Sequence, residues 1–145
     1  MDLNGKSGKM IELRQDNPKW AMLKLGKSGH TMSRFGCYVT VLASLLNRQP
    51  DEFLGFLNDN DCFEGFGLLN NAKLAKLLNM KYHYENGERP GENIACTGFW
   101  YKFGFPQHFF LKLTDGKIMD PLYGKVMENH YKIVSTRVWE NGNVI

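Results

Sequence analysis

The chain has 145 residues, which suits a single domain, and its net charge at pH 7 is only +3. Lys and Arg are scattered without a long run of like charge, so we expect neither nucleic acid nor an anionic membrane as a partner. Hydrophobic residues make up 43% of the chain, enough for a core without a disulfide or a metal. We therefore expect no cofactor and no metal, and the oligomeric state stays open.

The N-terminal residues 1–9 are polar and rich in Gly and Ser, so they predict a flexible lead before a single domain over residues 10–145. This lead lacks the apolar stretch of a secretory signal, and no segment approaches the ~20 apolar residues of a membrane span. We therefore expect cytoplasmic synthesis as a soluble chain. Association with a virion and release by lysis are the routes that would still take such a chain out of the cell.

Apolar patterning predicts helices in the first half of the chain. Residues 37–47 are almost wholly apolar and rich in β-branched side chains, so a buried strand is the rival interpretation, but their length favours a buried helix. Pro50 opens a second helix, followed by Asp51 and Glu52, because proline suits the first turn and acids suit the positive end of the helix dipole. A third helix is expected over about residues 68–79, where an apolar stripe recurs.

Strand-like runs fill the second half of the chain. Tyr82 and Tyr84 alternate with polar residues. Further strands are expected at residues 95–103, 107–113, 117–119 and 130–139. Helices first and strands afterwards indicate an α+β domain, in which an N-terminal helical half packs on a C-terminal antiparallel sheet.

Three cysteines compete for a reactive role, because an odd number cannot all pair and their spacing contains no C-x-x-C. Cys37 is expected at the first turn of the buried helix, where unpaired N–H groups and the helix dipole stabilise a thiolate. Gly36 leaves room beside the sulfur for a substrate backbone. A buried structural cysteine is the alternative for Cys37. Cys62 lies among acids that disfavour a thiolate, and Cys96 opens a strand, so we expect both to be structural.

Among the four histidines, His108 is the strongest candidate for a base, because it opens an apolar strand where an imidazole can be both desolvated and accessible. The loop after this strand decides whether an acid can orient the imidazole, and two loops fit the sequence. A two-residue loop of Asp115 and Gly116 would point His108 and Asp120 to opposite faces of the sheet. A three-residue loop, with Gly116 in the left-handed third position, would make His108 and Asp120 diagonal neighbours on one face, about 7–8 Å apart at the backbone.

With the three-residue loop, Cys37, His108 and Asp120 match the logic of a nucleophile, its base and the acid that orients the base. The N–H groups at the start of the helix can face the oxyanion of a tetrahedral intermediate. A second oxyanion donor is expected upstream of the cysteine. The candidates are Gln15 and Thr31, and a side-chain amide serves this role better than a hydroxyl that can rotate away.

Four segments carry a resemblance to a known family: residues 15–20, 36–40, 108–109 and 115–121. Their order and spacing, over about residues 11 to 125, resemble those of the C39-like branch of the papain-like cysteine peptidases, which includes single-domain proteins of phages and their bacterial hosts. The resemblance implies a papain-like α+β fold over residues 10–145. It implies the catalytic residues Cys37, His108 and Asp120, with Gln15 as the oxyanion glutamine. Tyr38 stands where many relatives have glycine, and Tyr38 would narrow the cleft.

The expected function is that of a cysteine peptidase or amidase that cleaves a peptide-type bond, in a protein or in the peptide stem of bacterial peptidoglycan. Two alternatives stay open: a non-catalytic phage or host-directed binding protein that keeps the scaffold, and an acyltransferase that uses the same three residues. Several aromatic side chains are candidates to line a cleft around the thiol: Trp20, Phe35, Tyr38, Phe99, Trp100, Tyr101 and Phe105.

Overall fold

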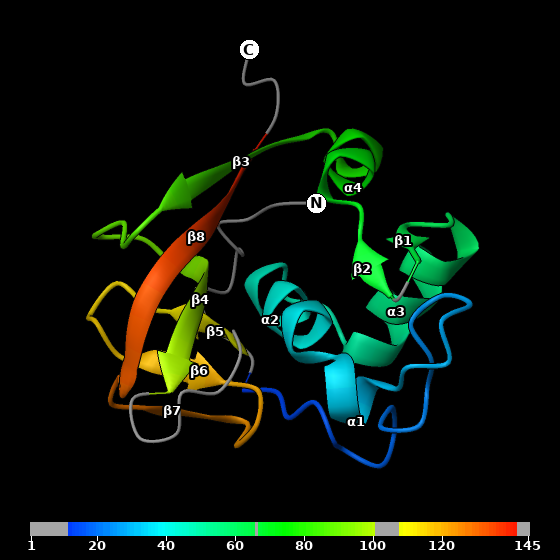
Figure 1. Cartoon of the computed structure of the whole chain (residues 1–145), viewed down its shortest axis with the longest axis horizontal. Coiled ribbons are helices and arrows are strands. Elements are labelled where there is room, and N and C mark those ends of the chain that lie inside the picture. The colour runs from blue at the N-terminus through cyan, green and yellow to red at the C-terminus, as the bar shows by residue number, and fades with distance from the viewer. Residues whose placement is uncertain (1–11, 66, 101–107, 142–145) are drawn as a thin grey trace.

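The computed structural model describes residues 12–65, 67–100 and 108–141, apart from the side chains of Phe99 and Trp100. In this part of the chain, helices from the first half lie against a six-stranded antiparallel sheet from the second half (Figure 1). The predicted α+β class with an antiparallel sheet is therefore confirmed.

The helical layer has four members in the described residues, α1 Met32–Phe35, α2 Cys37–Leu45, α3 Pro50–Asp59 and α4 Asn71–Leu78. The buried helix predicted from residue 37 is confirmed as α2, and the helix predicted from Pro50 is confirmed as α3. The short α1 leads into α2 through Gly36, and the sequence analysis did not expect it.

The predicted start of the third helix, at residue 68, is wrong. Leu68 and Leu69 form the strand β2, which pairs with β1 at Phe63–Glu64 in a small hairpin. The helix α4 begins only after Asn70, whose side chain accepts a hydrogen bond of 3.0 Å from the backbone N–H of Lys73. An asparagine in this capping position satisfies a donor that the first helical turn leaves unpaired, so it fixes where the helix begins.

The large sheet has the strand order β3-β8-β4-β5-β6-β7, and every neighbouring pair is antiparallel. Its strands are β3 Met80–Asn86, β4 Ile94–Trp100, β5 His108–Lys112, β6 Ile118–Asp120, β7 Lys125–Met127 and β8 Tyr131–Asn141. The C-terminal strand β8 thus lies inside the sheet, between β3 and β4 (Figure 1). The strand β7 was not predicted; its burial pattern, two exposed residues and one half-buried, gives little apolar signal.

The hairpin between β5 and β6 has the three-residue loop that would bring His108 and Asp120 to one face. Leu111 pairs with Met119, and the Leu113 N–H donates to the Lys117 carbonyl at 2.8 Å to close the loop. Gly116 takes φ +89°, the left-handed conformation expected at the third loop position. Of the two registers that the sequence left open, the structure has the one with the three-residue loop.

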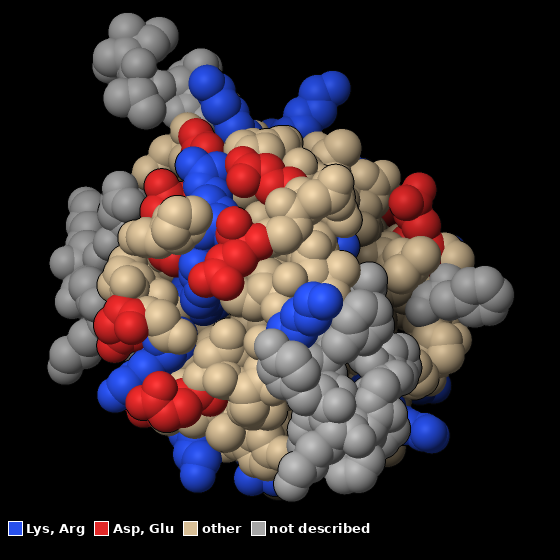
Figure 2. All heavy atoms as spheres, turned by 60° about the vertical axis from the view of Figure 1, so that its left-hand side comes forward, with Lys and Arg blue, Asp and Glu red and all other residues tan. Residues whose placement is uncertain are grey.

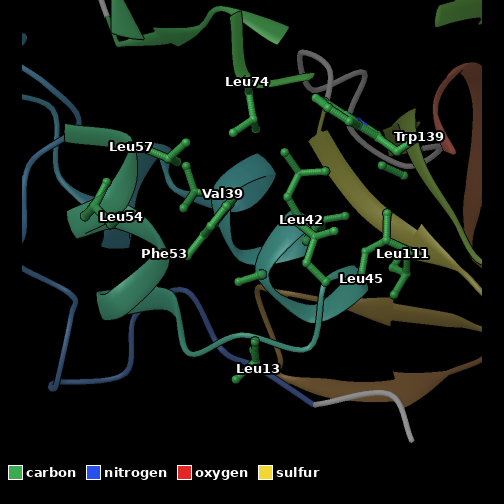
Figure 3. Close-up of a cluster of buried hydrophobic side chains, with 14 of the residues drawn as sticks. Leu13, Val39, Leu42, Leu45, Phe53, Leu54, Leu57, Leu74, Leu111 and Trp139 are labelled. Atoms are coloured by element: carbon green, nitrogen blue, oxygen red, sulfur yellow. The ribbon is translucent and has the colours of Figure 1, made fainter. Parts of the chain in front are cut away.

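The main core lies between the helices and the sheet, with α2 at its centre. Figure 3 shows Val39 and Leu42 of α2 among side chains from α3 on one side and from the sheet on the other. Leu42 is 1% exposed and Leu111 of β5 is fully buried. Burying side chains of this size contributes about 1.5–3 kcal/mol each, so this packing anchors α2 against β5.

A smaller cluster covers the other face of the sheet and includes Phe110 and Tyr131, whose rings stack at 4.7 Å between centroids. Gly98 of β4 makes this stacking possible, because a Cβ there would lie 2.8 Å from both side chains. On the face of the molecule in Figure 2, basic and acidic side chains are interspersed. None of the helices in residues 12–65, 67–100 and 108–141 is long and apolar enough to cross a membrane.

Candidate active site

Cys37 is the first residue of α2 and is half-buried. At this position the N–H groups of the first turn have no acceptor inside the helix, and the dipole places partial positive charge beside the sulfur. Gly36 has a structural role in addition to the expected one, which stays a prediction. A Cβ at Gly36 would lie 2.5 Å from the Met32 carbonyl oxygen, so glycine is needed there for α2 to follow α1 closely.

His108 and Asp120 form a direct hydrogen bond, in which His108 Nε2–H donates to Asp120 Oδ1 at 2.8 Å. The imidazole is mostly buried, with 16% of its side chain exposed, and the carboxylate is fully buried. Because Nε2 is engaged with the carboxylate, Nδ1 is the ring nitrogen left for the thiol. The structure therefore brings together the base and the acid that the hairpin register predicts.

The thiol of Cys37 lies close enough to the same imidazole to influence its protonation. Burial alone would lower the pKa of His108, but the hydrogen bond to Asp120, together with the negative charges of Asp120 and Cys37, raises it from 6.5 to about 9. A protonated imidazole beside the sulfur at neutral pH is the charge arrangement of an activated thiol.

Asp120 is satisfied by three donors. Besides His108, the Tyr131 hydroxyl donates to Oδ2 at 2.5 Å, and the Leu122 N–H donates to Oδ1 at 3.0 Å. Burial would raise the pKa of this carboxyl, but the hydrogen bond and charge of His108, with the Tyr131 and Leu122 donors, lower it below its usual value. Asp120 is therefore a fixed buried anion that can stabilise an imidazolium.

Tyr131 belongs to this site although the sequence analysis missed it. It begins β8, and its hydroxyl reaches Asp120 because β8 pairs with β4 in the middle of the sheet. Its pKa is raised, by burial first and then by the hydrogen bond to the carboxylate, so the hydroxyl keeps its proton and acts as a donor. Tyr131 could have been predicted only from the strand order of the sheet, and local sequence does not encode that order.

Gln15 is 3% exposed and lies against α1. Its Nε2 donates to the Ser33 carbonyl at 3.1 Å and approaches the Met32 carbonyl at 3.5 Å. Its buried Oε1 has no hydrogen-bond partner among the described residues. The other candidate, Thr31, exchanges a 3.2 Å hydrogen bond with Ser33. Both side chains lie beside the segment that leads into Cys37, and both bond to this segment.

The other two cysteines are fully buried, in the core clusters. Burial raises the pKa of Cys62, and the charge of Asp61 adds to this effect while that of Lys73 opposes it. Burial also raises the pKa of Cys96, to about 12. Neither thiol is suited to nucleophilic chemistry, in agreement with the structural role expected for both.

A cavity of about 210 Å³ opens beside Cys37. Phe35 and Tyr38 line it, as two of the aromatic residues expected near the thiol. Trp20 instead is buried in the core, where its Nε1 donates to the Arg14 carbonyl at 2.8 Å. The remaining aromatic candidates lie outside the described residues or side chains: Phe99, Trp100, Tyr101 and Phe105.

Tyr38 lines this cavity and contacts side chains of both the helices and the sheet. Its ring packs on Phe109 at 4.3 Å between centroids, and its hydroxyl donates to Asn71 Oδ1 at 2.6 Å while accepting from Trp139 Nε1 at 3.2 Å. A large side chain at the second position of α2 is therefore accommodated between the helices and the sheet.

In the described ranges, no group of three His, Cys, Asp or Glu side chains is placed to hold a metal ion. No protein-family model, curated protein or solved structure matches this chain.

Proposed function

We propose that this protein is a cysteine hydrolase that cleaves a peptide-type bond, with Cys37 as nucleophile, His108 as base and acid, and Asp120 as the group that orients His108. The observation that carries the proposal is that one imidazole is hydrogen-bonded to a buried carboxylate and lies beside a thiol at a helix N-terminus. A papain-like relationship is part of the proposal, supported by the order of these residues and by their placement on a helix and a neighbouring antiparallel hairpin.

The reaction begins from the ion pair in which His108 Nδ1 already holds the proton of Cys37 and the sulfur is a thiolate. The thiolate attacks the carbonyl carbon, and N–H groups at the start of α2 stabilise the oxyanion. When the C–N bond breaks, the imidazolium gives its proton to the leaving amine, and a thioester with Cys37 remains. Water then attacks the thioester as His108 Nδ1 takes a proton from it. The acid product leaves, and Cys37 returns to the thiolate beside the imidazolium.

Asp120 and Tyr131 act through His108. The carboxylate fixes the tautomer that carries the proton on Nε2 and stabilises the imidazolium in both halves of the reaction. The Tyr131 hydroxyl donates to the second carboxylate oxygen, so it holds the plane of the carboxylate toward His108. Tyr131 is therefore a positioning residue and not a catalytic one.

Proteins and the stem peptides of bacterial cell wall are both substrates with a suitable bond. To test the proposal, a library of unstructured peptides and a set of purified stem peptides are incubated with the protein, and new termini are mapped by mass spectrometry. Cleavage that disappears in Cys37→Ala and persists in Cys62→Ala supports the proposal. Cleavage that survives in Cys37→Ala refutes it, and the absence of cleavage from both substrate sets favours a binding protein that keeps the scaffold.

A further inference from the structure

The cavity beside Cys37 is lined mostly by apolar side chains, together with Asn71 and Arg137. Leu25, Val39, Phe63, Leu69 and Phe109 contribute to its wall. Arg137 of β8 is the one Lys, Arg, Asp or Glu side chain in the described lining. A single cation in an apolar hollow next to a nucleophile suggests recognition of an anionic group on the substrate.

Arg137 is fixed before any ligand arrives. Its Nη1 donates to Ser135 Oγ at 2.7 Å. Its guanidinium carbon lies 4.7 Å from the centroid of the Tyr84 ring and 5.2 Å from that of the Phe109 ring. Two aromatic contacts and a hydrogen bond restrict the side chain, so little conformational entropy is left to lose when Arg137 binds an anion.

The charge of Arg137 is not neutralised within the described residues, where no Asp or Glu oxygen lies within 4.0 Å of it. The neighbouring phenols do not supply an anion either. Burial raises the pKa of Tyr38 and of Tyr82 above the usual value, so both keep their protons at neutral pH. A guanidinium offers five N–H donors in a planar fork that matches a carboxylate, and Ser135 takes one of them.

We propose that the cavity binds a carboxylate of the substrate, on an acidic side chain or at a chain end, through Arg137, with an apolar group against Phe109 and Leu69. The proposal rests on the proposed hydrolase function, because it places this carboxylate close to the bond that Cys37 attacks. It makes Arg137 the residue that determines specificity for acidic substrates.

The test uses alkylating probes that react with Cys37 and need no known substrate. Three probes are compared: N-iodoacetyl-leucine, N-iodoacetyl-leucinamide and the N-iodoacetyl derivative of glutamic acid amide. Each rate at Cys37 is divided by the iodoacetamide rate of the same protein and by the rate of the same probe with glutathione. The first probe reports a terminal carboxylate, the third a side-chain carboxylate, and the second neither.

We expect the corrected rate of at least one carboxylate probe to be about tenfold higher than that of N-iodoacetyl-leucinamide, as a charge-assisted hydrogen bond allows. Arg137→Gln should remove the preference and Arg137→Lys should keep part of it. Arg48→Gln, which removes an equal charge beyond the other end of α2, should leave the preference in place. The unmodified protein alone provides a test that does not depend on how well a variant folds.

Equal corrected rates for all three probes in the unmodified protein would overturn the proposal, as would a preference that persists in Arg137→Gln. If Cys37 still reacts with iodoacetamide faster than glutathione and in a His108-dependent way, only the assignment of Arg137 fails. If iodoacetamide alkylates Cys37 no faster than it alkylates glutathione, the hydrolase function fails and the specificity proposal fails with it.

Discussion

The substitution Asp120→Asn tests whether the buried carboxylate sets the protonation of His108. It keeps the size of the side chain and removes its charge. The His108–Asp120 hydrogen bond is 2.8 Å long, and a hydrogen bond to a charged group contributes about 1.5–3 kcal/mol. At about 1.4 kcal/mol for each tenfold change in proton affinity, losing that charge should lower the pKa of His108 from about 9 to about 7–8.

The assay is an NMR titration of the imidazole signals, with His108 assigned by the loss of its signal in His108→Gln. Glu85→Gln is the matched control, because it removes a carboxylate that pairs with the exposed His83 at 2.6 Å. The control should leave the His108 titration unchanged. Two results would refute the reasoning. One is a pKa of His108 near 6.5 in the unmodified protein, and the other is the same His108 pKa in Asp120→Asn as in the unmodified protein.

The same shift makes stability depend on pH in a defined direction. The pKa of His108 is about 9 in the folded protein, whereas a histidine without partners, as in the unfolded chain, has a pKa of 6.5. The folded state therefore binds this proton more tightly than the unfolded state. The resulting stabilisation, about 3 kcal/mol, is fully present below about pH 6.5 and is lost as the pH rises through 9. In Asp120→Asn, this alkaline loss of stability should begin at lower pH.

Three further substitutions, one of them with a matched control variant, test the hydrogen bonding and packing of the site and the core by urea unfolding. Tyr131→Phe should destabilise the protein by about 1.5–3 kcal/mol, because it removes a hydrogen bond to a charged carboxylate. The difference in unfolding free energy between the variant and the unmodified protein should shrink at acidic pH, once Asp120 takes up a proton. Because the pKa of this carboxyl is lowered in the folded state, that happens below the usual range of an aspartate. Gly36→Ala should destabilise the protein by about 1–3 kcal/mol through the clash with α1. The control Gly55→Ala, in open space on α3, should stabilise the protein by about 0.5–1 kcal/mol. Equal effects of the two substitutions would contradict the packing described for Gly36. Leu42→Ala should cost about 2.7–5 kcal/mol, and a loss below 1 kcal/mol would be inconsistent with its place at the centre of the core.

Local sequence predicted the structure best where a single residue at a turn or at the start of a helix restricts the backbone. Pro50 with its following acids predicted α3. The glycine at position 116 reduced the hairpin to two possible loops, one of which puts His108 and Asp120 on one face and is the loop in the structure. In both places a single residue restricts the backbone strongly, so the local pattern carries the information.

Long-range packing decided what the sequence did not predict. Leu68 and Leu69 have helical spacing relative to the residues that follow, but glycines at positions 65 and 67 take positive φ and turn the chain into a hairpin instead. Tyr131 and Arg137 reach the site only because β8 is inserted between β3 and β4. No local period encodes that insertion, so neither residue stood out among the polar and aromatic positions of its strand.

The most direct test of the central claim is the rate at which iodoacetamide alkylates Cys37 at pH 7, read by mass spectrometry at each of the three cysteines. The claim predicts that Cys37 reacts at least about tenfold faster than glutathione, as expected for a thiolate held by an imidazolium, and that His108→Gln removes this advantage. Cys62 and Cys96, both buried, should stay unmodified in the folded protein. A Cys37 that reacts no faster than glutathione, or equally fast without His108, would contradict the proposed site.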